Sequence, residues 1–298
     1  MSPATSHEAF VEANGLRHHL TVWDGGGRTT VLFLHGWLDL GRTWTALVEA
    51  LPPGTDWHCA ALDWRGHGQT DRVPAGGYYH FADYVRDLDQ VARQIRRDRL
   101  VVVAHSMGAM VASLWLGARP EAATGLVMVE GLGPPATSPA EYVRRMASWL
   151  DQTAPYDPAR FDRPMQNLDH AVARLHRAEP RIPADRARRL AEWATVTGPD
   201  GRLRWRYDPL HRTHAPVPIP LEAGLEFWQR ITCPVLWVGG TLSPWTGPEL
   251  DKRIAMLPRG IRHRIPGAGH AVHNDAPEAM ATLLAAFIQS LPADPASR

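Results

Sequence analysis

The sequence contains few cysteines and almost no lysine, and both shortages narrow the choice of function. Cys59 and Cys233 are its two cysteines, and neither has a second metal ligand at short spacing. Lys252 is the single lysine, so the basic residues are almost all arginine. With 32 basic and 31 acidic residues the formal net charge is +1. No global field therefore favours nucleic acid or an anionic membrane as a partner.

Long apolar stretches are missing as well. The opening residues lack the apolar segment of a signal peptide, and no run of about 18 apolar residues follows. The sequence also has no glycine-rich phosphate loop and no metal-ligand cluster of His, Cys and carboxylates. We therefore expect a cytoplasmic protein, a monomer or homodimer, that spans no membrane and needs no metal or organic cofactor.

What the sequence does contain is an alternation of apolar, strand-like runs with amphipathic helical stretches. This alternation is typical of a mostly parallel sheet covered by helices on both faces. A length of 298 residues is enough for one large α/β domain with an insertion. The expected strands are Leu16–Trp23, Val31–Leu34, Trp57–Leu62, Leu100–Ala104, Gly125–Val129, Pro234–Val238 and Arg262–Ile265.

The alternation stops between about residues 133 and 229, where strand-like runs give way to proline, arginine and helical periodicity. Ser138, Pro139 and Glu141 have the pattern of an N-cap, a first helical residue and a capping-box partner. We therefore expect a helical insertion over residues 133–229, and a core formed by residues 1–132 and 230–298.

The stretch LVVVAHSMG, from Leu100 to Gly108, indicates a nucleophile. A strand ends there, a helix follows, and Ser106 lies in the tight turn between them. Such a turn holds its central residue in a strained conformation, so the residues two before and two after must be small. Ala104 and Gly108 meet this requirement.

Two further loops are expected to meet Ser106. The strand VLFL is followed by His-Gly-Trp, which would direct the backbone N–H of Trp37 toward the same pocket. Together with the N–H of Met107, it would form an oxyanion hole. His270 lies in the glycine-rich loop after the last expected strand and is the candidate base, with His273 as its rival.

The chain resembles the α/β-hydrolase superfamily over nearly its whole length. The resemblance rests on HGWLD at 35–39, DWRGHG at 63–68, AHSMG at 104–108 and GAGH at 267–270. It implies the α/β-hydrolase fold, with a helical lid inserted after strand 6. The chain looks most like the serine hydrolase-like group, whereas dehalogenases and epoxide hydrolases of this fold use a carboxylate nucleophile rather than serine.

The acid of the expected triad is missing from its usual loop. After the strand that ends at Val238 stand Thr241, Leu242 and Ser243, and none is a carboxylate. Glu130, at the end of the strand Gly125–Val129, occupies a position similar to that of the acid in haloalkane dehalogenases. Because any strand end that reaches the histidine Nδ1 can supply the acid, we expect a triad of Ser106, Glu130 and His270.

Alternatives to this acid stay open. Asp39 and Asp251 are weaker candidates. Glu130 could instead brace a turn while a water molecule or Ser243 serves His270.

Other polar and aromatic residues have simpler expected roles. His35, His67, Asp63 and Arg65 are expected to brace turns, and the arginines at 186, 188 and 189 to lie on a solvated helix face. Within the insertion, Trp149, Trp193 and Trp228 are candidates to line an apolar acyl pocket, although tryptophans also pack in cores.

The sequence thus predicts a serine hydrolase that cleaves a carboxylic ester, lactone or thioester of a small molecule through an acyl-enzyme. The lid shows no basic cluster dedicated to phosphates, which favours an apolar or mildly polar substrate. The same fold also supports lyase or isomerase reactions and ligand-binding receptors, which are the alternatives.

Overall fold

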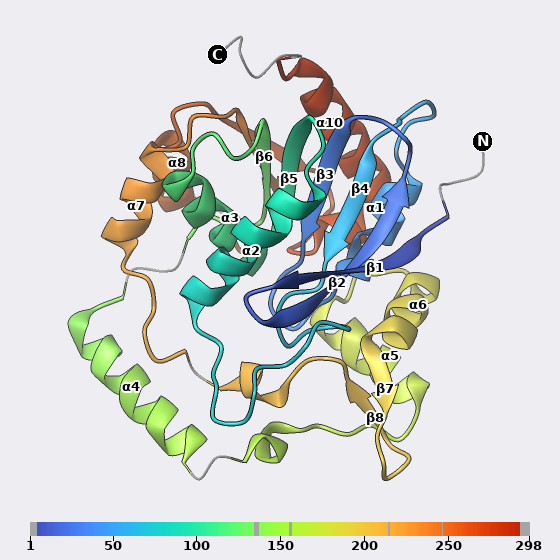
Figure 1. Cartoon of the computed structure of the whole chain (residues 1–298), viewed down its shortest axis with the longest axis vertical. Helices are drawn as coiled ribbons and strands as arrows, with labels where there is room; N and C mark the ends of the chain where they lie inside the picture. Colours follow the sequence, from blue (N-terminus) through green and yellow to red (C-terminus); the bar gives the residue numbers. More distant parts are fainter. Residues whose placement is uncertain (1–4, 134–136, 155–156, 214, 246, 293–298) are drawn as a thin grey trace.

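The computed structural model describes residues 5–133, 137–154, 157–213, 215–245 and 247–292. Its main sheet has eight strands in the order β1-β2-β4-β3-β5-β6-β9-β10 (Figure 1). Strands β1 and β4 run antiparallel to β2, and the other neighbours are parallel. The strands are β1 His7–Ala13, β2 Leu16–Asp24, β3 Thr29–Leu34, β4 His58–Leu62, β5 Arg99–His105, β6 Gly125–Val129, β9 Val235–Gly240 and β10 Gly260–Ile265.

All seven expected strands are confirmed, and the fold is the α/β fold that the sequence predicts. Strand β1 was not expected. It is an edge strand with a single neighbour, and it carries the charged residues Glu8 and Glu12. Edge strands commonly lack a strong apolar signal because charge there prevents pairing with other chains.

Helices cover both faces of this sheet (Figure 1). Successive strand residues point to opposite faces, so Leu32 and Leu34 belong to one apolar cluster while Val31 and Phe33 belong to the other. Helices α2, α3, α7 and α8 contribute to the first cluster, and α1, α9 and α10 to the second. The helices are α1 Thr45–Glu49, α2 Phe81–Ile95, α3 Met107–Ala118, α4 Pro139–Thr153, α5 Leu168–Ala178, α6 Ala184–Ala194, α7 Leu221–Gln229, α8 Pro248–Ala255, α9 Val272–Asp275 and α10 Pro277–Ser290.

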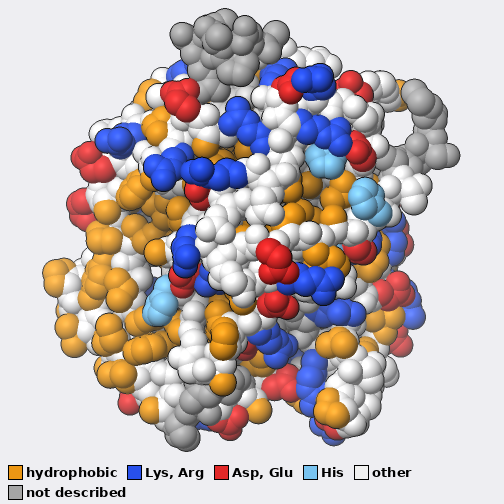
Figure 2. Space-filling model, viewed as in Figure 1, with side chains coloured by type: hydrophobic (Ala, Val, Ile, Leu, Met, Phe, Trp, Pro, Cys, Tyr) orange, Lys and Arg blue, Asp and Glu red, His pale blue; other side chains and the backbone are white. Residues whose placement is uncertain are grey.

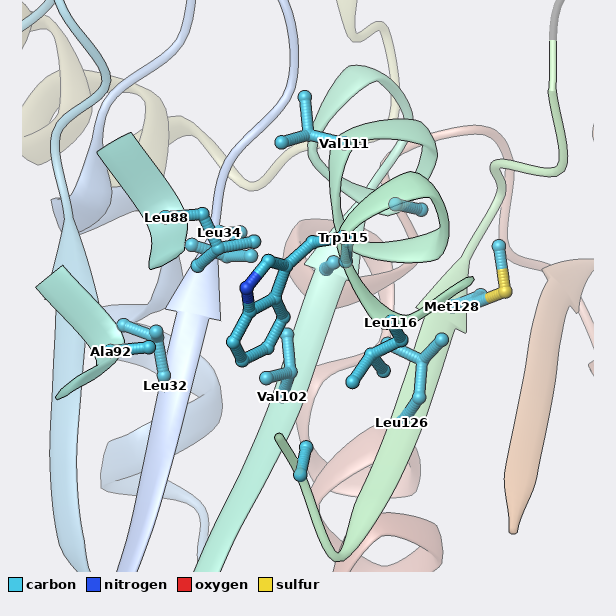
Figure 3. Close-up of a cluster of buried hydrophobic side chains, with 14 of the residues drawn as sticks. Leu32, Leu34, Leu88, Ala92, Val102, Val111, Trp115, Leu116, Leu126 and Met128 are labelled. Atoms are coloured by element: carbon cyan, nitrogen blue, oxygen red, sulfur yellow. The ribbon is translucent and has the colours of Figure 1, made fainter. Parts of the chain in front are cut away.

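Helix α3 is packed tightly into the first cluster. Figure 3 shows Trp115 of α3 lying against Val102 of β5, with Leu88 and Ala92 of α2 on one side. Burial of large apolar side chains is the main favourable term in folding. Because α3 begins directly after β5, this packing also fixes the position of the turn that joins them.

The insertion follows β6 and contains more than helices. Besides α4, α5 and α6 it includes the short hairpin of β7 Thr195–Thr197 and β8 Leu203–Trp205, and the 3₁₀ turns Pro158–Phe161 and Pro209–Arg212. Ser138 caps α4 as expected, because its side chain accepts a hydrogen bond from the Glu141 amide. The Glu141 carboxylate pairs with Arg144 and Arg145.

The expected end of the insertion, residue 229, is wrong. Helix α7 packs against α3. Its Trp228 is 1% exposed and donates a hydrogen bond from Nε1 to Ser113 Oγ at 3.1 Å. The helical periodicity of α7 is the same in a core helix and a lid helix, so the sequence alone did not separate them. The insertion therefore ends before α7.

Helix α4 has no buried residue. Val143, Met146 and Leu150 are exposed on it, at spacings that place them on one side of the helix. Figure 2 shows hydrophobic side chains gathered on the left of the molecule, where α4 and α7 lie in Figure 1.

Candidate active site

Ser106 lies between β5 and α3 in a conformation that few residues adopt. Its φ is 49° and its ψ is −112°, which is a strained region for a residue with a Cβ. A Cβ on Gly108 would come within 2.7 Å of the Leu34 and His35 carbonyl oxygens. A Cβ on Gly131 would come within 2.5 Å of the Ser106 backbone carbonyl oxygen. The expected need for small neighbours is therefore confirmed at Gly108, and it extends to Gly131.

Glu130 and His270 meet although 140 residues separate them in the chain. Glu130 directly follows β6, and His270 follows the glycine-rich turn after β10. The Glu130 Oε2 lies 3.2 Å from the His270 Nδ1. The Glu130 side chain has no exposed surface, whereas that of His270 is 39% exposed. A histidine is thus held by a buried carboxylate on one ring nitrogen.

The loop after β9 forms hydrogen bonds with the Glu130 carboxylate. The Gly240 amide donates to Glu130 Oε1 at 2.7 Å, and the Ser243 hydroxyl donates to Oε2. The Glu130 amide itself donates to the Val238 carbonyl at 2.9 Å. Ser243, which was considered as a partner for His270, therefore positions the carboxylate. Asp251 is paired with Arg262 at the surface.

Ser106 and His270 line one cavity of about 360 Å³. Residues from the turn after β3, from the insertion and from the loop after β9 complete its wall, among them Trp37, Glu179 and Leu242. Within the described residues, no hydrogen bond joins the Ser106 hydroxyl to His270. In active sites without ligand such bonds are often long and tighten only when substrate is bound.

A family model described as "Alpha/beta hydrolase family" matches residues 31–283, which is most of the chain. The chain belongs to the alpha/beta hydrolase family. Among curated relatives, the hydrolase is 26% identical to a serine hydrolase-like protein of Danio rerio, over 90% of this chain and 84% of that protein. It is 24% identical to the sn-1-specific diacylglycerol lipase ABHD11 of Mus musculus, over 87% of this chain and 80% of that protein.

Solved structures agree with this family. The thioesterase domain from the curacin biosynthetic pathway superposes with a TM-score of 0.85 and is 27% identical, covering 95% of this chain and 99% of that one. In the described part of the hydrolase, no helix has both the length and the apolar character needed to cross a membrane.

Two backbone amides of the hydrolase are positioned near Ser106. Met107 is the first residue of α3, and the first amides of a helix have no partner inside the helix. Trp37 follows Gly36, and a Cβ on Gly36 would come within 3.4 Å of the Ser106 Cβ. The Trp37 side chain donates from Nε1 to the His211 carbonyl at 2.9 Å, which ties this turn to the insertion.

The residues expected to brace turns do so. His35 Nε2 accepts a hydrogen bond from the Trp64 amide at 3.0 Å. Asp63 accepts from the Gly41 amide at 2.6 Å and contacts His19 Nδ1 at 2.7 Å. Arg65 donates two hydrogen bonds to Asp87, both of 2.6 Å. These contacts hold the loops that surround the cavity.

His273, the rival base, is fully buried. Its ring stacks on Trp44 with centroids 4.4 Å apart, and its Nε2 lies 3.1 Å from Thr43 Oγ1. Burial lowers the pKa of His273 to about 3. His273 does not line the cavity that holds Ser106, so its position contradicts a role as base.

Asp39 is a feature of the cavity that the sequence indicated only as a weak substitute acid. It lines the same cavity as Ser106, where burial and the nearby Glu179 raise its pKa to about 8. Asp39, His105 and His273 offer ligand atoms within 4.8 Å of one another. His105 Nε2 already lies 3.1 Å from the His270 carbonyl oxygen.

The three tryptophans of the expected acyl pocket have different environments. Trp228 is a core residue, so its assignment to substrate binding is wrong. The Arg42 guanidinium lies over the Trp193 ring, 5.0 Å from the ring centre. Trp193 does not line the Ser106 cavity. Trp149 contacts Tyr78 edge to face at 5.4 Å. Tyr78 lines a second cavity of about 320 Å³ that shares Trp37 with the first.

The buried histidines predict a loss of stability in acid. Burial lowers the pKa of His35 to about 4 and of His211 and His273 to about 3, and it lowers the pKa of His67 and His105 as well. The unfolded chain then binds more protons than the native state below the unfolded histidine pKa of about 6.5. The free energy of unfolding should fall as pH drops from 6.5, by up to about 1.4 kcal/mol per pH unit for each histidine.

Denaturant unfolding from pH 7.5 to 4.5 measures this effect. A His273→Phe variant keeps a ring beside Trp44 but cannot be protonated, so its stability should decline less steeply than that of the wild type. The raised pKa values of Asp39 and Glu179 act in the opposite direction, since they favour the native state at lower pH. Equal slopes for the variant and the wild type would contradict the assignment.

Proposed function

We propose that the hydrolase cleaves the carboxylic ester or thioester of a small molecule through an acyl-enzyme, with Ser106, His270 and Glu130 as its triad. The observation that carries this proposal is the 3.2 Å contact between Glu130 Oε2 and His270 Nδ1, at the cavity into which the turn of Ser106 also opens. A lactone is an internal ester and falls in the same class.

The proposed chemistry follows from the tautomer that Glu130 selects. An N–H on His270 Nδ1 donates to the carboxylate, which leaves Nε2 unprotonated as a base. Nε2 takes the Ser106 proton while the Ser106 oxygen bonds to the acyl carbon. It then gives that proton to the departing alkoxide or thiolate, and water hydrolyses the acyl-enzyme by the same sequence.

Charge that develops on the acyl oxygen needs donors nearby. In the proposed mechanism these are the backbone N–H groups of Trp37 and Met107. The amide of Met107 also lies at the N-terminus of α3, where the helix dipole favours negative charge.

We further propose that the insertion between β6 and α7 acts as a cap that shapes the acyl site. Trp149 of α4 supports the ring of Tyr78 behind the second cavity. Replacing Trp149 with alanine should enlarge this cavity and change the preference among acyl chain lengths more than the activity toward acetate esters. A Trp193→Ala variant is the matched control, because Trp193 lines neither cavity. Equal loss across all chain lengths in folded Trp149→Ala would contradict the cap role.

A panel of p-nitrophenyl esters and acyl thioesters from two to twelve carbons, combined with a serine-reactive phosphonate, tests the proposed function. Turnover together with labelling of Ser106 supports the hydrolase. Labelling without turnover points to a lyase or isomerase reaction, and absence of labelling points to a binding protein. Both of the latter results would contradict the proposal.

A further inference from the structure

A separate cavity of about 380 Å³ adjoins the Ser106 cavity. The two share Asp39, Ala178 and Glu179 as lining residues. The adjoining cavity lies among α5, α6 and the residues after β8, which Figure 1 shows together below the sheet. Nothing in the proposed acyl-transfer mechanism uses it.

Four arginines line this cavity: Arg163, Arg174, Arg177 and Arg212. Within the described residues, none of them lies within 4.0 Å of a carboxylate oxygen. Arg174 donates to the carbonyl oxygens of Arg163 and Pro164, and Arg212 to the Tyr207 hydroxyl at 3.4 Å. The cavity thus gathers four guanidinium groups that form no ion pair with any acid in the described part of the chain.

Several other arginines of the insertion are paired with acids. Arg186, Arg188 and Arg189 on α6 pair with Glu278, Asp169 and Glu49. Acidic partners are therefore available to some arginines of the insertion, whereas the four arginines of this cavity have none among the described residues.

Two acids on the shared wall oppose this charge less than exposed carboxylates would. Burial raises the pKa of Asp39 to about 8 and also raises that of Glu179. A carboxyl group with a raised pKa holds its proton more readily near neutral pH and repels an anion less.

We propose that the arginine-lined cavity binds an anionic group of the substrate, a phosphate or a carboxylate, while the acyl carbon lies at Ser106. The inference rests on the proposed acyl transfer at Ser106. Guanidinium groups bind phosphate and carboxylate with paired, charge-assisted hydrogen bonds. The aromatic rings of Trp205 and Tyr207 also line this cavity and lie nearly parallel, at 14°.

This inference changes the substrate class that the sequence favoured. The four arginines are separated by up to several tens of residues and form no run, so no basic cluster was visible before the chain was folded. Two substrate pairs test the inference and separate the two anions. Butyryl-4′-phosphopantetheine and butyryl-pantetheine differ by one phosphate, and mono-p-nitrophenyl glutarate and its methyl ester differ by one negative charge.

The quantity to measure is the ratio of kcat/KM between the charged and the neutral member of each pair. One pair should show a ratio of about ten or more in the wild type, because a charged hydrogen bond is roughly twice as strong as a neutral one. The ratio should fall toward one in Arg177→Gln/Arg212→Gln, and rising salt should weaken it. Arg188→Gln removes a charge from α6 at a position that does not line the cavity, and it should keep the wild-type ratio.

Ratios near one for both pairs in the wild type, or a preference that survives in the double variant, would overturn the inference. If the double variant does not fold, Arg177→Gln alone gives the same comparison. Hydrolysis of the neutral members without preference leaves the proposed function standing. Failure to hydrolyse either member, with Ser106 unlabelled by phosphonate, refutes the proposed function itself.

Discussion

Replacing Ser106 with alanine is expected to lower kcat by about 10⁴-fold or more toward the best ester or thioester of the panel. The proposed reaction has no other nucleophile, because His270 acts on the Ser106 hydroxyl and the backbone donors only stabilise charge. The residual rate would come from substrate binding and the oxyanion donors. Initial rates with wild type and variant at equal folded concentration measure the effect.

The Ser106→Ala variant should stay folded. Its side chain lies at the cavity wall, and the strained φ of 49° is imposed by the strand and helix on either side. The matched control is Ser290→Ala, which removes a hydroxyl from α10 that is bonded to the Phe287 carbonyl. This control should keep wild-type activity. Activity within tenfold of wild type in pure, folded Ser106→Ala would contradict the nucleophile assignment.

Replacing Glu130 with glutamine is expected to lower kcat by roughly 10²- to 10⁴-fold with little change in KM. The glutamine oxygen can still accept from the Gly240 amide, but its NH₂ group would then face His270 Nδ1. Two N–H groups cannot bond to each other, so the imidazole loses its preferred tautomer and the charge that stabilises its protonated form.

A Ser243→Ala variant distinguishes the effect of the Glu130 charge from the effect of the hydrogen bond that positions the carboxylate. It keeps the carboxylate but removes the hydroxyl that donates to Oε2, so its loss of kcat should be clearly smaller than that of Glu130→Gln. Circular dichroism and thermal unfolding should show a native fold for both. Glu130→Gln within a few-fold of wild type would mean that Glu130 does not act through His270.

The central strands were predictable because their apolar runs are continuous. Residues on both faces of β3, β5 and β6 are buried, so these strands are almost entirely valine, leucine and similar residues. Strand β1 was not predicted because it pairs with a single strand and its side chains are half exposed. Helix α7 was placed in the insertion because periodicity shows that a helix has an apolar face, but not what covers it.

The residues of the candidate site likewise differ in whether the sequence alone could predict them. Ser106 and His270 were recognisable from local motifs, since a tight turn leaves a signature of small residues. The contact between Glu130 and His270 could be predicted because a carboxylate directly after a buried strand needs a partner. The arginine-lined cavity could not be predicted. Its arginines come from the segment after the 3₁₀ turn Pro158–Phe161, from α5 and from the 3₁₀ turn Pro209–Arg212, and only the folded insertion brings them together.

The loop after β9 holds the Glu130 carboxylate at only two of its positions. The polar contacts of this carboxylate come from Gly240, Ser243 and His270. Leu242 and Pro244, from the same loop, line the Ser106 cavity instead. A loop that must present a catalytic acid tolerates little variation in length or composition. In the proposed triad the loop after β9 holds the acid through one amide and one hydroxyl only. Substitutions at its cavity-lining positions are therefore expected to change selectivity without displacing the triad.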